Sequence, residues 1–347
     1  MYLFAPIMSS VRTTKMKKIN HLLPLAAILL AGCATPGGTS SEISSATSEN
    51  VTWLTPTGAP TLAFYDQGAN ANWVSTSVST DIPAAFASES YDAIVFDGVS
   101  GLNLIAANSR EYKFAQWINE GTFYLVSTKH TAEEKIAEGS KPTIDAFVAT
   151  GNASRAFRHL AKNTWKWGEY AAETEASSIT YESGVADVLK NLLSSGTSEN
   201  AYDYYLVAEP VLTNAKAKLG DSLHVIYDLQ AEFAAANDGA KIPAAGLFVS
   251  NKAYASKKAE IDVFLSETAK RVETVYTTPA VAAESLKQYA AIEGNDVSAR
   301  FGIGPALVTS VNSSYLPSSR VADNKAVADG FNTILGGQAF ASSLFLN

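Results

Sequence analysis

The 347-residue chain contains a single cysteine, Cys33, so an intramolecular disulfide is excluded and the folded part must be stabilised by a hydrophobic core. The histidines that follow it are His130, His159 and His224. They are far apart in sequence, form no H-x-x-x-H pair and have no thiol beside them, whereas a structural zinc site needs closely spaced nitrogen and sulfur ligands. The sequence therefore predicts no metal site.

Motifs of nucleotide binding and nucleophilic catalysis are also missing. Gly302-Ile303-Gly304-Pro305 lacks the later glycine of the dinucleotide fingerprint. Gly98-Val99-Ser100-Gly101 lacks the G-x-S-x-G spacing of a nucleophile elbow. No glycine-rich loop ends in Lys-Ser or Lys-Thr, which a phosphate-cradling loop requires. We therefore expect no cofactor and no enzymatic activity.

Positive charge is scarce. The chain has 26 Lys and Arg against 34 Asp and Glu, a formal net charge of −8. A nucleic-acid ligand calls for a basic stripe, so this class of partner is excluded.

The N-terminal segment, by contrast, is apolar. Lys17 and Lys18 precede the apolar run Leu22–Ala31, as in a secretory signal that is too short to span a bilayer. The run closes with Leu30-Ala31-Gly32-Cys33, which resembles the lipobox of bacterial lipoproteins.

This resemblance implies that residues 1–33 are a lipoprotein signal peptide with lipidated Cys33, cleaved after Gly32. Two acyl chains on Cys33 would anchor the protein stably to the cell membrane, on its extracytoplasmic face. The start codon is open between Met1 and Met16. Cleavage would remove four cations and no acid, taking the formal charge from −8 to −12.

Residues 34–50 are rich in Ser, Thr, Gly and Glu and are predicted to be a flexible linker. From Val51 onward, short strand-like runs alternate with amphipathic stretches, the pattern of an α/β fold. We expect a surface helix over Lys257–Tyr276 and a shorter helix over Gly184–Leu193. Strands are predicted at Thr61–Tyr65, Ala93–Phe96, Thr122–Ser127, Asp145–Ala149, Tyr204–Ala208, His224–Tyr227 and Ala245–Ser250.

Several segments, in this order, resemble a known family. They are Leu54–Pro60, Ile82–Phe86 followed by Tyr91–Asp97, Phe147–Ser154, Tyr204–Val211 and Pro243–Ser250. Together they resemble the substrate-binding proteins of ABC importers, in the branch that takes nitrate, sulfonates, taurine and thiamine-pyrimidine precursors. The sequence Ala208-Glu209-Pro210 is similar to the family's E-P signature. Ser90 and Asp97-Gly98 depart from the family's glycine and proline at the third strand.

The resemblance implies a two-lobe periplasmic-binding-protein (type II) architecture, each lobe a mostly parallel sheet flanked by helices. The first lobe would comprise residues 51–142 plus 252–347, and the second residues 143–251. The chain would be the monomeric solute-binding subunit of an ABC importer, and its partners a small-molecule ligand, a permease and an ATPase. The alternatives are a non-transport surface or sensory lipoprotein on the same fold and an enzyme that makes a pyrimidine precursor.

Ligands of open α/β sheets bind beyond the carboxyl ends of strands, where small residues let the backbone approach. Three strand ends meet this description, and the E-P signature adds a fourth position. The candidate ligand-binding residues are Thr55, Thr57, Gly58, Asp97, Gly98, Ser100, Gly151, Asn152, Ser154 and Glu209. The alternative for the three loops is that they only form turns.

Two of these residues carry charge. Glu209 could accept a hydrogen bond from a ligand N–H or could cap the helix expected from Val211. Asp97 could bind ligand or could shape a turn. Because neither Arg nor Lys lies in the loops, the acids disfavour a small anion and favour a neutral or cationic heteroaromatic ligand. Aromatic residues in or near the loops are candidates for stacking on it: Tyr65, Trp73, Phe96, Trp165 and Trp167.

Overall fold

The computed structural model describes residues 47–78, 80–108, 110–134, 136–170, 178–197, 201–317 and 323–346. The predicted signal peptide, Cys33 and most of the predicted linker lie outside these residues. The first described element lies before the predicted residue 51: Ser48–Asn50 forms a 3-10 turn, η1, and the Ser48 hydroxyl donates to Glu267 over 2.6 Å.

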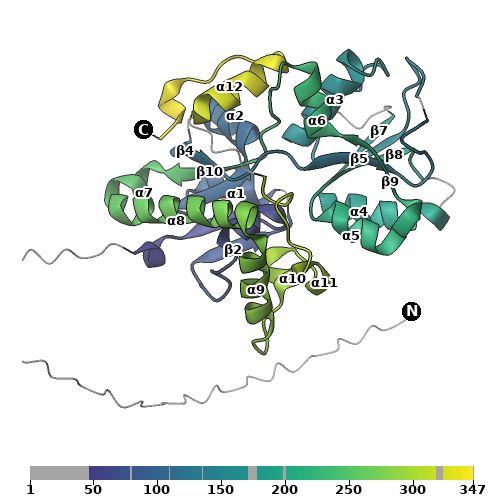
Figure 1. Cartoon of the computed structure of the whole chain (residues 1–347). Helices are drawn as coiled ribbons and strands as arrows, with labels where there is room; N and C mark the ends of the chain where they lie inside the picture. The colour runs from purple at the N-terminus through teal and green to yellow at the C-terminus, as the bar shows by residue number, and fades with distance from the viewer. Residues whose placement is uncertain are drawn as a thin grey trace, which may run out of the picture. The chain divides into compact units, whose positions relative to one another are not determined.

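The first of two five-stranded sheets has the strand order β2-β1-β3-β10-β4. Its strands β2, β4 and β10 are labelled in Figure 1. Its strands are β1 (Trp53–Pro56), β2 (Trp73–Thr76), β3 (Ala93–Asp97), β4 (Tyr112–Trp117) and β10 (Ala245–Ser250). β1 pairs in parallel with β2 and β3, whereas β10 pairs antiparallel with β3 and β4. Four strands therefore run in one direction and β10 runs against them.

The second sheet repeats this plan in the order β7-β6-β8-β5-β9. Its strands are β5 (Phe123–Ser127), β6 (Ile144–Phe147), β7 (Ile179–Glu182), β8 (Tyr204–Ala208) and β9 (His224–Asp228). β6 is parallel to β7 and β8, and β5 is antiparallel to β8 and β9. The single reversed strand is here β5, so both sheets are mostly parallel and the predicted two-lobe α/β class is confirmed.

Helices flank both sheets. The first sheet is accompanied by α1 (Asp81–Ser88), α2 (Gly98–Asn108), α7 (Asn251–Ser256), α8 (Lys258–Thr277), α9 (Pro279–Ala290), α10 (Val297–Phe301), α11 (Pro305–Val308) and α12 (Asn324–Ile334). The second carries α3 (Asn152–Asn163), α4 (Val185–Ser194), α5 (Val211–Leu219) and α6 (Leu229–Ala236). Short 3-10 turns are η2 (Ala59–Phe64), η3 (Ser195–Thr197), η4 (Gly220–Ser222) and η5 (Ser342–Leu344). Among the described helices, none combines the length and apolarity needed to cross a bilayer.

Hydrophobic clusters pack on both faces of each sheet. One cluster joins Phe114 and Phe248 of the first lobe with Phe157 and Phe233 of the second. Two further clusters cover the other face of each sheet. Alternate residues of a strand point to opposite faces, so strands between two clusters are apolar throughout. All six residues of β10 are accordingly buried.

The chain changes sheet twice. It crosses between β4 and β5 and returns between α6 and β10. The two crossing segments are joined, because Gly121 N donates to Ile242 O over 2.7 Å and Ala244 N donates to Asn119 O over 3.0 Å. β5 thus belongs to the second sheet and β10 to the first, so the changes of sheet do not coincide with the predicted lobe borders at 142/143 and 251/252.

Most predicted elements are present. The strands predicted around β3, β5, β6, β8, β9 and β10 are confirmed, as are the helices α4 and α8. The predicted strand Thr61–Tyr65 is wrong, because Ala59–Phe64 forms the 3-10 helix η2. Pro60 lies in its first turn, where a fixed φ and a missing N–H are tolerated.

Candidate functional site

The N-terminal ends of α2 and α3 face each other across the two lobes. β3 ends at Asp97 and α2 begins at the next residue, while α3 begins at Asn152 in the second lobe. The Asp97 carboxylate accepts the backbone N–H of Ser100 through Oδ1, over 2.9 Å, and that of Asn152 through Oδ2, over 2.8 Å. The Ser100 hydroxyl also donates to the carbonyl of Thr150 over 3.0 Å. Two of the three predicted loops are therefore in direct contact.

Several charges and dipoles act on Asp97. Burial raises the pKa of its carboxyl, while the hydrogen bonds from Asn152 and Ser100 and the positive charge of Arg155 oppose this rise. Each helix N-terminus also presents unpaired N–H groups and a partial positive charge, which stabilise a carboxylate.

The third predicted loop, which follows β1, makes its hydrogen bonds elsewhere. Gly58 has φ +99 and its N–H donates to the Phe301 carbonyl over 2.9 Å. A Cβ on Gly302 would lie 2.6 Å from Gly58 N, so the backbone of residues 301–302 packs directly on this loop. Thr55 is fully buried, and its hydroxyl donates to the neighbouring Pro56 carbonyl over 3.1 Å.

Ser154, Gly98 and Gly151, three further predicted site residues, contact neighbouring protein atoms. The Ser154 hydroxyl donates to Phe147 O over 2.7 Å, and both residues belong to the second lobe. A Cβ on Gly98 would lie 2.0 Å from the Trp117 ring, so its small size is required for packing. A Cβ on Gly151 would lie 3.2 Å from Val148 O and 3.8 Å from Asp97 Oδ2.

Glu209 makes the contacts of a helix cap. Its two carboxylate oxygens accept the N–H and the hydroxyl of Thr213, over 3.0 and 3.1 Å, at the start of α5. Burial raises the pKa of Glu209, and these hydrogen bonds oppose the rise. Tyr315, from the C-terminal part of the chain, is fully buried beside Thr213 and Glu209. It is a neighbour that sequence spacing did not suggest.

Basic side chains also lie closer than the loop sequences suggested. Arg155 Nη2 donates to Asn332 Oδ1 of α12 over 2.8 Å, so it joins the two lobes. Arg158 Nη1 donates to Ala149 O over 2.9 Å. A cavity of about 520 Å³, lined by Arg155, Asn332 and Asn103 among others, adjoins this region. The helical spacing from Gly151 could have indicated both arginines, since they lie one and two turns into α3.

The aromatic candidates serve mainly the core. Trp73 and Trp167 are each 1% exposed, and Tyr65 is 8% exposed. Trp165 stacks on Tyr227 with ring centroids 4.3 Å apart and donates Nε1–H to Glu232 over 3.0 Å. Phe96 packs edge-on against Phe86.

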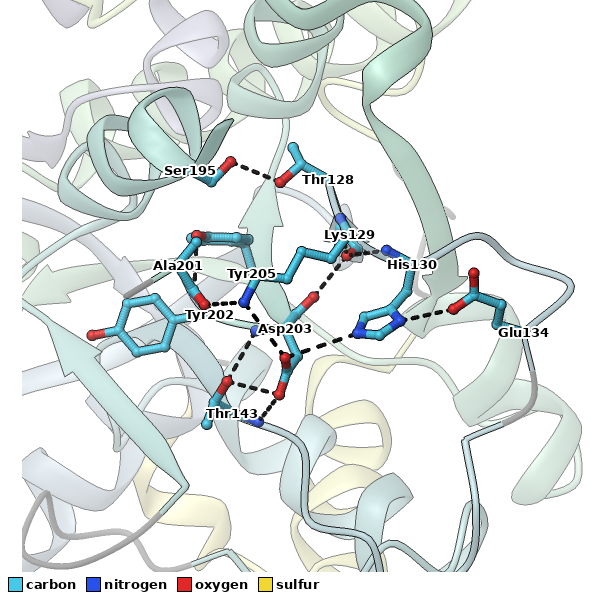
Figure 2. Close-up of polar contacts among 11 residues, drawn as sticks. Thr128, Lys129, His130, Glu134, Thr143, Ser195, Ala201, Tyr202, Asp203 and Tyr205 are labelled. Carbon is cyan, nitrogen blue, oxygen red and sulfur yellow. Dashed lines mark hydrogen bonds and ion pairs between the residues drawn. The ribbon is translucent and has the colours of Figure 1, made fainter. Parts of the chain in front are cut away.

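A second polar cluster, shown in Figure 2, lies at the opposite end of the second sheet. Asp203, just before β8, accepts the N–H and hydroxyl of Thr143, just before β6, each over 2.8 Å. His130 lies between Glu134, 2.8 Å from Nδ1, and Asp203, 3.8 Å from Nε2. Because these residues precede β6 and β8 whereas the candidate loops follow them, the cluster fastens the sheet rather than extending the site. Within the described part of the chain, no three His, Cys, Asp or Glu side chains are grouped so as to hold a metal ion.

Comparisons with known proteins give a fold and no sequence family. No protein-family model matches the chain, and no curated protein matches it. Solved structures do match. An ABC transporter structure from Parabacteroides distasonis is 15% identical, with a TM-score of 0.59 over 86% of this chain and 98% of that one.

Two further structures have the same character. The zinc-bound ligand-binding component of an ABC-type import system from Staphylococcus aureus is 10% identical, with a TM-score of 0.61 over 86% of this chain and 96% of that one. The alkanesulfonate-binding protein SsuA from Xanthomonas axonopodis pv. citri, bound to MOPS, is 12% identical, with a TM-score of 0.56 over 85% of this chain and 94% of that one. At these identities the chain shares the periplasmic-binding-protein fold with them.

Proposed function

We propose that this chain is the extracytoplasmic solute-binding subunit of an ABC importer, which closes two lobes on a small organic ligand. The observation that carries the proposal is the meeting of α2 and α3, one from each lobe, at the carboxyl ends of β3 and β6. In open α/β sheets this is where ligands bind. The shared fold with ABC-import binding proteins supports the same role.

The proposed site consists of the three strand-end loops. Thr57 and Gly58 follow β1, Asp97 ends β3, Ser100 lies in the first turn of α2, and Asn152 begins α3. A neutral or cationic heteroaromatic solute, such as a thiamine-pyrimidine precursor, is favoured over sulfonate or nitrate, because Asp97 already places a carboxylate at this position. The MOPS-binding relative is therefore a guide to the fold and not to the ligand.

The anchor completes the proposal. Cys33, after the lipobox-like sequence, would carry the lipid, and residues 34–46 would separate the folded part from the membrane. The monomer would deliver its solute to a permease that is driven by a cytoplasmic ATPase. Incorporation of labelled palmitate into the wild-type chain and its absence from Cys33→Ser test the anchor.

Solute binding is tested by thermal unfolding with a panel of aminopyrimidines, sulfonates and nitrate. A solute at one hundred times its Kd stabilises the folded protein by about 2.7 kcal/mol. We expect aminopyrimidines to raise Tm and Thr57→Ala to reduce this rise. Thr128→Ala, at the opposite end of the second sheet, is the matched control and should retain it. No response across the panel would favour the non-transport lipoprotein instead.

A further inference from the structure

Asp97 occupies a position that helix geometry makes suitable for an oxyanion. Its carboxylate accepts one N–H from the first turn of α2, at Ser100, and one from the first turn of α3, at Asn152. Free N–H groups and the helix dipole make such N-termini anion-binding sites. Here the anion is the Asp97 carboxylate of the chain itself, which belongs to the first lobe, whereas α3 belongs to the second.

Other contacts hold the same two surfaces together. The Ser100 hydroxyl donates to Thr150 O over 3.0 Å, and Arg155 Nη2 donates to Asn332 Oδ1 over 2.8 Å. The Arg155 guanidinium also lies 5.7 Å from the ring centroid of Phe331 in α12. α3 is therefore fastened to the first lobe along its first turns.

Asn152 adds an independent observation. Its side chain is 0% exposed and donates through Nδ2 to Pro243 O, over 2.8 Å, in the segment that returns to the first sheet. Within the described residues its buried Oδ1 has no hydrogen-bond partner. A buried acceptor without a donor is unfavourable, so Asn152 carries an unsatisfied polar atom in the turn of α3 that meets Asp97.

We propose that Asp97 is a built-in carboxylate that fills the oxyanion position at the N-terminus of α3, holds the two lobes together and excludes anionic solutes from this position. The fastening of the lobes stands independently, whereas the exclusion of anionic solutes rests on the proposed solute-binding function. A solute that binds here would present N–H donors to Asp97.

Asp97→Ala in the full chain tests the proposal, with formate and methanesulfonate as probes. Two quantities are measured: the radius of gyration by small-angle scattering, and hydrogen exchange of the peptide that contains Asn152. Without a probe, we expect a larger radius of gyration and exchange that is faster by about tenfold or more, since charge-assisted hydrogen bonds are among the stronger ones. Each probe anion should reverse both changes saturably, and the wild-type protein should not respond.

Two variants make the test specific. Asp203→Ala removes a carboxylate that also accepts a backbone N–H, but within one lobe, and should leave the radius of gyration unchanged. Asp97→Asn keeps the side-chain volume, so it guards against a failure of the alanine variant to fold. It should speed exchange at Asn152 without responding to formate, because the amide still fills the position.

An unchanged radius of gyration and unchanged exchange in both Asp97 variants would overturn the fastening role. An opened Asp97→Ala protein that ignores both anions would overturn the oxyanion position. Neither result depends on an identified solute. Failure of the solute-binding function would show instead as silence of the wild-type protein in the solute panel.

Discussion

The pH dependence of stability should reveal the carboxyl of Asp145 in β6. Its side chain is fully buried, and its Oδ1 has no partner among the described residues. Burial raises its pKa from 3.8 to about 6, against the lowering effect of a 3.0 Å hydrogen bond from Asn191, and the nearby Glu182 and Asp187 add to the rise. The folded protein therefore keeps a proton on Asp145 at pH values where the unfolded chain has lost it.

The sign and size of the effect follow from proton linkage. Stability falls with rising pH wherever the native state binds more protons than the unfolded state. This window runs from the unfolded pKa of 3.8 to the folded pKa of about 6. At 1.36 kcal/mol per pKa unit, Asp145 costs the folded protein up to about 3 kcal/mol above that window.

Asp145→Asn removes the titration and keeps the shape of the side chain. The free energy of unfolding is measured by urea denaturation between about pH 4 and pH 7 for wild type and variant. We expect the difference, variant minus wild type, to rise by up to about 3 kcal/mol across this range. A difference that is flat with pH, or that falls, would show that the pKa of Asp145 is not raised in the folded protein. Any constant offset reports the new buried amide hydrogens, which cost about 1–3 kcal/mol if unpaired.

Three further predictions concern stability, each measured by urea or thermal unfolding. Gly98→Ala should lower the free energy of unfolding by about 1–3 kcal/mol, because its Cβ would overlap the Trp117 ring. Gly330, which is exposed within α12 with open space around it, is the control, and Gly330→Ala should raise the free energy of unfolding by about 0.5–1 kcal/mol. Equal effects of the two substitutions would contradict the packing argument. Asp228→Ala should cost about 1 kcal/mol, since its side chain caps α6 by accepting from Gln230 N and Ala231 N, and an unchanged midpoint would contradict this role. Although burial acts to raise it, the pKa of Asp203 is lowered by the Thr143 hydrogen bonds, so the stabilisation that Asp203 provides should be lost as pH falls below the ordinary carboxyl range. Asp203→Asn should therefore make the free energy of unfolding less dependent on pH in this acidic range. An unchanged dependence would contradict a lowered pKa of Asp203.

The sequence predicts strands well where every residue of an apolar run is buried. The six apolar or small residues of β10 and the run Tyr204–Ala208 lie between hydrophobic layers, so composition alone marked them as strands. The run Thr61–Tyr65 has the same composition and is equally buried, yet it belongs largely to a 3-10 helix. An apolar run reports burial and not backbone shape, and the residue that favours a helical turn here is Pro60.

The candidate site shows a different limit. The sequence indicated both Asp97 and Asn152 from strand ends and small neighbours, but not that one binds the other, because 55 positions separate them. That contact depends on how the two lobes are joined through the crossing segments, which local patterns do not specify. For Glu209 the local alternative, helix capping, was visible in sequence because Pro210 and Val211 follow directly.

Capture of a small organic solute by this chain can be measured by native mass spectrometry of the protein purified without denaturation, followed by denaturing release of whatever is bound. We expect a single neutral or cationic compound of roughly a few hundred daltons, in keeping with the size of ordinary ligand pockets. Release of a sulfonate or nitrate would contradict the proposed ligand class. A protein that is free of ligand in every preparation and does not respond to the solute panel would contradict solute capture itself.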